Sequence, residues 1–333
     1  MCMYSSTDGF SNDWHLVHLG SRAVGGAALV MQEATAISPE GRITASDLGI
    51  WKDEHTDNLK RIVSFLHEHG ALAGIQLAHA GRKASCRKPW EGGAHVPSDQ
   101  PGGWMTVAPS ALSFKEGTEA PVALDEAGIH QVKDDFRAAA RRAKLVGYDV
   151  VEIHAAHGYL LHQFLSPLSN QRTDIYGGSF ENRVRLLLEV TRIVKEVWGD
   201  QPLFVRLSAT DWVPGGWTID ESVKLAKLLK DLGVDLIDTS SGGNVVQAPI
   251  PSMPGYQVHF AERIKKETGI LTGAVGLITT AEQANNILEK GEADVVSFAR
   301  ELLRDPYFAL HAAQALGDDI SWPAQYERGR IKK

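Results

Sequence analysis

Short runs of apolar, β-branched residues alternate with amphipathic stretches of helical period along almost the whole chain. This alternation is the feature that most constrains the fold, because strands separated by helices pair in parallel through crossover connections. The pattern predicts seven strands, each followed by a helix, at residues 27–36, 72–77, 150–153, 203–208, 236–240, 270–274 and 295–299. The sequence therefore indicates an α/β fold with a parallel sheet.

Polar side chains stand at or near the end of almost every expected strand. They are Glu33, Gln76, His154, Arg206, Ser240 and Arg300. Convergence from many strand ends is typical of the mouth of a (β/α)8 barrel. A doubly wound open sheet is the alternative, but no GxGxxG motif follows the first strand. Because the expected elements begin with a helix at 14–23 and only seven strands are expected, we expect a TIM barrel whose missing first strand would precede residue 1.

Composition places few further limits on the function. Hydrophobic residues make up 43% and the net charge is -7, which argues against a general nucleic-acid binder. The sequence shows no apolar run of the roughly 18 residues that a membrane span needs, and no signal peptide. The two cysteines, Cys2 and Cys86, exclude a disulfide framework and fit a cytoplasmic protein. We expect one domain over residues 1–333, with a long loop at about 84–120 that covers a site.

The end of the third expected strand carries the strongest candidate site. His154 and His157 follow the buried run 150–153, and Tyr159 lies just beyond. Two imidazole donors and a phenol suit the binding of a substrate oxygen and the delivery of a proton. Two alternatives remain open: both histidines could be structural, or they could bind a metal. No further ligand stands at metal spacing, and we expect Glu152 to face away from the histidines.

Four other strand ends carry residues that suit the binding of an anion or a polar ring. Gly276 follows the sixth strand, and Ala299 and Arg300 follow the seventh, where barrels commonly bind phosphate. The alternative is that the glycine serves only a turn and Arg300 pairs with a nearby carboxylate. Arg206 and Gln76 are expected inside the barrel, facing either a bound anion and heterocycle or structural partners.

Longer motifs, spread over nearly the whole chain, are similar to those of a known protein family. They include residues 1–4 (MCMY), 74–83 (GIQLAHAGRK), 152–159 (EIHAAHGY), 172–183 with its DIYGG core, 300–306 and 325–328. The chain resembles the old yellow enzyme family of FMN-dependent ene-reductases, in its xenobiotic reductase and thermophilic-like group. The resemblance implies an NADPH dehydrogenase that reduces the C=C bond of α,β-unsaturated carbonyl compounds.

The resemblance also implies roles by matching position. His154 and His157 would hold the substrate carbonyl, and Tyr159 would donate the proton. FMN would contact a set of residues drawn from the chain start and five strand ends. This set comprises Met1, Cys2, Ala34, Gln76, Arg206, Gly276, Ala299 and Arg300. Tyr4 would contact the substrate, and Arg328 would reach the site of a neighbouring subunit, which implies a homodimer or higher oligomer.

Members of that family carry a hairpin and a first strand ahead of the segment that begins here at Met1. A barrel without one strand exposes two unpaired edges. We therefore expect this chain, expressed as written, to be unstable or to bind FMN weakly. The competing function is a non-catalytic or weakly FMN-binding relative. An iron–sulfur branch of the superfamily is excluded, because two scattered cysteines cannot ligate a cluster.

Overall fold

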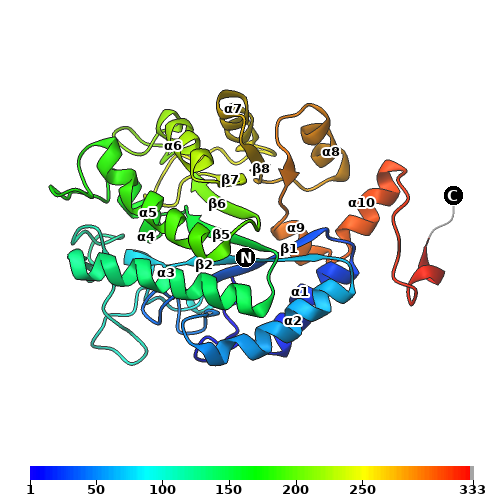
Figure 1. Ribbon diagram of the computed structural model, residues 1–333, viewed down its shortest axis with the longest axis horizontal. Coiled ribbons are helices and arrows are strands. Elements are labelled where there is room, and N and C mark those ends of the chain that lie inside the picture. Colours follow the sequence, from blue (N-terminus) through cyan, green and yellow to red (C-terminus); the bar gives the residue numbers. More distant parts are fainter. Residues whose placement is uncertain (331–333) are drawn as a thin grey trace.

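The computed structural model describes residues 1–330, and its centre is a seven-stranded parallel sheet (Figure 1). The strands are β1 (Leu29–Ala36), β2 (Leu72–Ala78), β5 (Val150–Ala155), β6 (Leu203–Ser208), β7 (Leu236–Ser240), β8 (Leu271–Ala274) and β9 (Val295–Val296). Each coincides with one of the seven runs expected from the sequence. A short pair, β3 (Val107–Ala108) and β4 (Val122–Ala123), forms a separate parallel sheet at the 84–120 loop.

The order of the strands decides between the two expected architectures. Along the sheet the order is β1-β2-β5-β6-β7-β8-β9, so each strand lies beside its predecessor in the sequence. A doubly wound sheet reverses its strand order at a switch point, whereas a barrel adds strands in one direction. The predicted barrel-type α/β fold is confirmed. Within residues 1–330, β1 and β9 form the two outer strands of the sheet.

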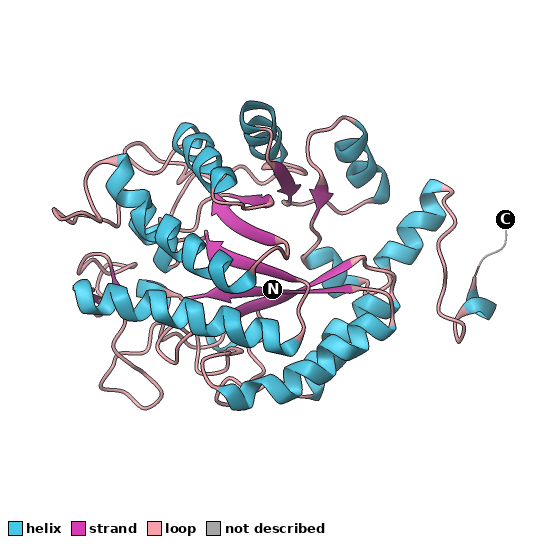
Figure 2. Cartoon of the chain, viewed as in Figure 1, coloured by secondary structure: helices cyan, strands magenta, loops and turns pink. Residues whose placement is uncertain are grey.

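Helices surround the strands on the outer side (Figure 2). They are α1 (Asp13–Val24), α2 (Thr56–Glu68), α3 (Glu126–Val146), α4 (Leu160–Leu165), α5 (Phe180–Trp198), α6 (Ile219–Asp231), α7 (Val258–Thr268), α8 (Ala281–Glu289), α9 (Arg300–Arg304) and α10 (Phe308–Leu316). Short 3₁₀ turns add η1 (Asp53–His55), η2 (Gly81–Lys83), η3 (Pro89–Glu91) and η4 (Glu327–Gly329). In the part of the chain described, no helix is long and apolar enough to cross a membrane.

Side-chain caps explain where the longer helices begin. Asp125 accepts the Gly128 amide at the start of α3, and Ser179 accepts the Asn182 amide at the start of α5. Thr218 and Glu221 form a reciprocal capping box at the start of α6. These caps satisfy amides that have no partner within the helix, so the boundaries expected from the sequence agree closely with the structure.

The core lies between the helices and the outer face of the sheet. The buried stripe of α3 includes Ile129, Val132 and Phe136, and β5 is buried along its full length. A strand buried on both faces belongs to the interior of a parallel sheet. Residues at the end of β5 are therefore fixed from all sides, which suits a rigid site.

Candidate active site

Three aromatic side chains from the end of β5 form a tight cluster. The ring centroids of His154 and His157 lie 5.1 Å apart, and those of His154 and Tyr159 lie 5.0 Å apart, both edge to face. His154 is buried and the other two rings are half-buried. The structure thus brings together the three residues expected from the sequence, because the turn after β5 folds back beneath the strand end.

The turn that carries this cluster has an unusual backbone. His157 and Gly158 both adopt positive φ, at 59° and 71°. Such a conformation costs a non-glycine residue about 1–3 kcal/mol, so it persists only where surrounding contacts hold it. Ser208 accepts the His157 amide at 2.9 Å, and the Lys83 ammonium donates to the His157 carbonyl at 2.8 Å. Groups from β6 and from the loop after β2 therefore hold the turn in place.

Burial keeps the cluster uncharged. The pKa values of His154 and His157 are lowered well below their usual value, first by burial and then by the positive charge of Arg206. Burial also raises the pKa of Tyr159 well above its usual value, with Cys2 and other neighbours adding to the effect. The imidazoles are thus neutral and the phenol keeps its proton at neutral pH.

Hydrogen bonds define which nitrogens can act as donors. The Ala156 amide donates to His154 Nδ1 at 3.2 Å, so the ring proton of His154 lies on Nε2. His157 Nε2 lies 2.7 Å from the Ser240 hydroxyl. His154 Nε2–H makes no hydrogen bond to any residue among 1–330, and it is available to an oxygen of a ligand.

A polar group lies on the neighbouring strands β2, β5, β6 and β7, beside the cluster. Gln76 donates to Glu152 at 2.5 Å, and Arg206 Nε lies 3.4 Å from Asp238 Oδ2. The expectation that Glu152 faces away from the histidines was wrong. Side chains two residues apart on a strand share a face, so Glu152 lies on the side of His154. Burial, followed by the charge of Asp238, raises the pKa of Glu152 to about 8.

Arg206 supplies a test of whether a flavin fits here. Its buried Nε has no hydrogen-bond partner in the described structure, and Asp238 is its one close carboxylate there. An unsatisfied buried guanidinium is costly, and an electron-rich ring edge would supply acceptors. The side-chain carbonyl oxygen of Gln76 also remains available, since only the NH₂ group of Gln76 donates to Glu152. These donors and acceptors fit the pyrimidine edge of a flavin.

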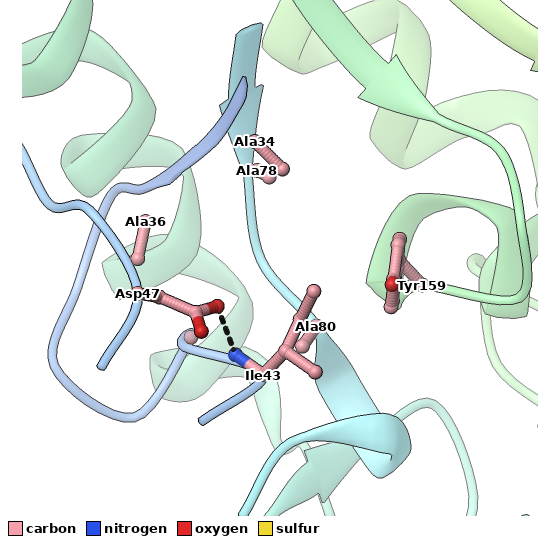
Figure 3. A pocket seen from close by; sticks show the side chains of 8 residues that line it. Ala34, Ala36, Ile43, Asp47, Ala78, Ala80 and Tyr159 are labelled. Atoms are coloured by element: carbon pink, nitrogen blue, oxygen red, sulfur yellow. Dashed lines mark hydrogen bonds between the residues drawn. The ribbon is translucent and has the colours of Figure 1, made fainter. Parts of the chain in front are cut away.

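Small side chains form a cavity next to this polar group. Figure 3 shows Tyr159 across the cavity from Ala34, Ala78 and Ala80. The remaining lining residues are Ala36, Gly41, Ile43 and Asp47. Alanines from the ends of β1 and β2 wall this cavity, so no bulky side chain from either strand fills it.

The start of the chain lies close to Tyr159. Burial, followed by Cys2 and Tyr4, raises the pKa of Tyr159, and burial followed by Cys2 raises the pKa of Tyr4. The Met3 amide donates to Glu33 at 2.9 Å, which anchors this segment on β1. Met1 is largely exposed. The structure therefore places Cys2 and Tyr4, but not the Met1 side chain, beside the candidate site.

The region expected to bind phosphate also contains Tyr256, which the sequence did not point to. Tyr256 packs against Gly276, where an added Cβ would lie 3.0 Å from its ring. Burial raises the pKa of Tyr256, and the charges of Arg300 and Arg206 oppose that shift. Arg300, next to Ala299, is exposed, and Glu301 and Asp305 pair instead with Arg304 and His311. The carboxylate partners considered for Arg300 are thus engaged elsewhere.

The 84–120 loop folds over the mouth. Trp90 lies edge to face with Tyr4 at 6.0 Å, and the Lys83 ammonium lies 4.5 Å from the ring centre of Phe114. Lys83 was also missed as a site residue, although a basic residue in the turn η2 that follows β2 could have signalled it. Arg328 is exposed in η4, at the end of the chain that extends away from the sheet (Figure 1). Residues 1–330 contain no group of three or more ligands arranged for a metal ion.

Comparison with known proteins places this geometry in a family. The model of the NADH:flavin oxidoreductase / NADH oxidase family matches residues 1–319. An NADPH dehydrogenase of Geobacillus sp. (strain WCH70) is 52% identical over 331 residues, covering 99% of this chain and 92% of that protein.

Solved structures agree with this placement. A morphinone reductase structure is 31% identical with a TM-score of 0.80, and the match covers 97% of this chain and 86% of that one. A 2-naphthoyl-CoA reductase is 27% identical with a TM-score of 0.84, and the match spans 96% of this chain but 49% of that longer one. The chain belongs to the NADH:flavin oxidoreductase / NADH oxidase family and is an FMN-dependent oxidoreductase.

Proposed function

We propose that this protein uses NADPH to reduce the C=C bond of α,β-unsaturated carbonyl compounds. The observation that supports this proposal most is the uncharged cluster of His154, His157 and Tyr159, which lies at a cavity lined largely by alanine and glycine. The relatives named NADPH dehydrogenase support NADPH as the reductant. The cluster supplies two things that such a reduction needs: hydrogen-bond donors for the carbonyl oxygen and a group that donates a proton.

The two histidines hold the carbonyl oxygen of the substrate. Both are neutral, and His154 presents Nε2–H with no partner among the described residues. When bound, FMN supplies the hydride that adds to the β-carbon. Negative charge then develops on the carbonyl oxygen, where fixed donors in a buried site are most effective.

Tyr159 delivers the proton to the α-carbon. Its pKa is raised well above the usual value by burial, so the hydroxyl is protonated whenever substrate binds. Its ring lies 5.0 Å from that of His154, so one substrate can contact both groups. Positioned proton donors typically contribute 10²–10⁴-fold to a rate.

Three sets of residues would hold FMN. Gln76 and Arg206 would hydrogen-bond its pyrimidine ring, Ala34 and Cys2 would contact the ring system, and Gly276, Ala299 and Arg300 would bind its phosphate. Tyr4 contacts the substrate from the chain start. Arg328 contributes to the site of a second copy, which makes the functional unit an oligomer of this chain.

Replacement of both histidines tests the proposal. We expect His154→Ala with His157→Ala to raise the KM for 2-cyclohexen-1-one by at least tenfold, because the carbonyl loses both donors. FMN content should remain near that of the parent protein. His67→Ala, at the opposite end of the barrel and paired with Asp149 at 2.7 Å, is the matched control. An unchanged KM in the double variant would contradict the proposed role.

A further inference from the structure

A buried histidine and a buried aspartate lie directly behind the site turn. His162 belongs to α4, and Asp211 lies in the loop after β6. Both side chains are fully buried, and His162 Nε2 lies 3.1 Å from Asp211 Oδ1. Neither residue contacts the cavity beside Tyr159, so neither has a part in the chemistry proposed above.

Asp211 is surrounded by hydrogen-bond donors. Its Oδ2 accepts the Ser166 hydroxyl at 2.5 Å, the Trp217 amide at 2.9 Å and the Asn244 side-chain amide at 3.4 Å. Burial alone would raise its pKa, but His162 and these hydrogen bonds outweigh burial and lower the pKa to about 2. Asp211 is therefore an anion throughout the neutral range.

His162 connects this anion to the site turn. Its Nδ1 accepts the Gly158 amide at 2.8 Å, so that nitrogen carries no proton. The ring proton must then lie on Nε2, which is 3.1 Å from Asp211 Oδ1, close enough for an electrostatic contact but not aligned as a hydrogen bond. Gly158 stands between His157 and Tyr159, and its φ of 71° depends on how its amide is held.

We propose that Asp211 and His162 are a positioning pair that fixes the tautomer of His162 and thereby holds the turn from His157 to Tyr159 in its working geometry. The pair touches neither substrate nor cofactor, and it acts through the Gly158 amide. The kinetic part of this inference rests on the proposed function, whereas the tautomer part does not.

The substitution Asp211→Asn separates charge from shape. Because Ser166, Trp217 and Asn244 all donate to Oδ2, the amide oxygen of the new side chain must take that place. Its NH₂ group then faces His162 Nε2–H, donor against donor. His162 can relieve this conflict only by moving its proton to Nδ1, which removes the acceptor for the Gly158 amide.

The test is ¹⁵N NMR of histidine-labelled, FMN-loaded protein at neutral pH. We expect the parent protein to show His162, assigned by its loss in His162→Gln, as neutral with the proton on Nε2. In Asp211→Asn the proton should move to Nδ1. Asp149→Asn is the matched control, since Asp149 pairs with His67 at 2.7 Å away from the turn. Its His162 signals should match those of the parent.

Kinetics give the second readout. Asp211→Asn should raise the KM for 2-cyclohexen-1-one by about 10- to 100-fold with FMN content unchanged, because small misplacements of binding groups are costly. A parent His162 that is cationic or protonated on Nδ1 would overturn the inference, even if no variant folds. So would an unchanged KM in Asp211→Asn in an enzyme that reduces the enone. Absence of enone reduction in the parent would instead contradict the proposed function.

Discussion

At the scale of single residues, environment rather than residue type decides what Tyr159 does. Burial raises the pKa of Tyr159, so its hydroxyl keeps its proton more tightly than the hydroxyl of an exposed tyrosine does. We expect Tyr159→Phe to slow the oxidation of reduced enzyme by an enone by about 10²–10⁴-fold, because the proposed proton donor is lost. Reduction by NADPH should keep its rate. Stopped-flow absorbance of the two half-reactions measures both.

A buried tyrosine at the other end of the same strand provides the control. Tyr148 donates to Gln32 at 2.5 Å, away from the cluster, so Tyr148→Phe should lower stability without slowing either half-reaction. Equal slowing of both half-reactions in Tyr159→Phe would contradict its role as proton donor. The sequence signalled this residue through its place after a strand end, but it could not show the burial that sets its pKa.

At the scale of elements, the turn between β5 and α4 shapes the site, and Gly158 is its tightest point. Its φ is positive, and an added Cβ would lie 2.2 Å from the Gly243 carbonyl oxygen. We expect Gly158→Ala to lower the free energy of unfolding by several kcal/mol, from strain and from the clash together. It should also raise the KM for an enone, since His157 and Tyr159 flank the turn.

Gly178 offers a matched comparison, because it too has positive φ but a Cβ there would meet nothing within 4 Å. Gly178→Ala should cost about 1 kcal/mol and leave the KM unchanged. Equal costs at the two positions, measured by urea unfolding, would show that the contact with Gly243 does not matter.

Elements were predictable where local signals were strong. The seven strands show β-branched runs, and Asp125, Ser179 and Thr218 are caps that a sequence displays. α4 and α9 were missed because each is short and has no side-chain cap. The assignment of Glu152 to the opposite face of β5 was wrong, because residues two apart on a strand, such as Glu152 and His154, point to the same side. The contacts of Asp211 with His162, and of Lys83 with His157, join distant segments and have no local signature.

At the scale of the whole molecule, buried carboxyls link stability to pH. Glu152 has a pKa raised to about 8, above the 4.5 of an unfolded glutamate, so the native state binds the proton more tightly. The stability contributed by this group is present at low pH and is lost as pH rises through that interval. Glu152→Gln should therefore gain stability relative to the parent by roughly 3–4 kcal/mol between pH 5 and pH 8.

Urea unfolding at fixed FMN concentration at the two pH values measures this gain. A glutamine can still accept from Gln76 and donate to Asp238, so the substitution removes charge and little else. Glu289→Gln, at an exposed site, is the control and should show no change with pH. If the stability difference between Glu152→Gln and the parent is the same at both pH values, the raised pKa of Glu152 is contradicted.

The most direct test of the central claim follows one turnover of the loaded protein. Purified protein saturated with FMN is reduced anaerobically with one equivalent of NADPH, and 2-cyclohexen-1-one is then added. We predict that the yellow colour of oxidised flavin returns and that one equivalent of cyclohexanone forms. A protein that binds no FMN, or that is reoxidised without forming the saturated ketone, would contradict the account.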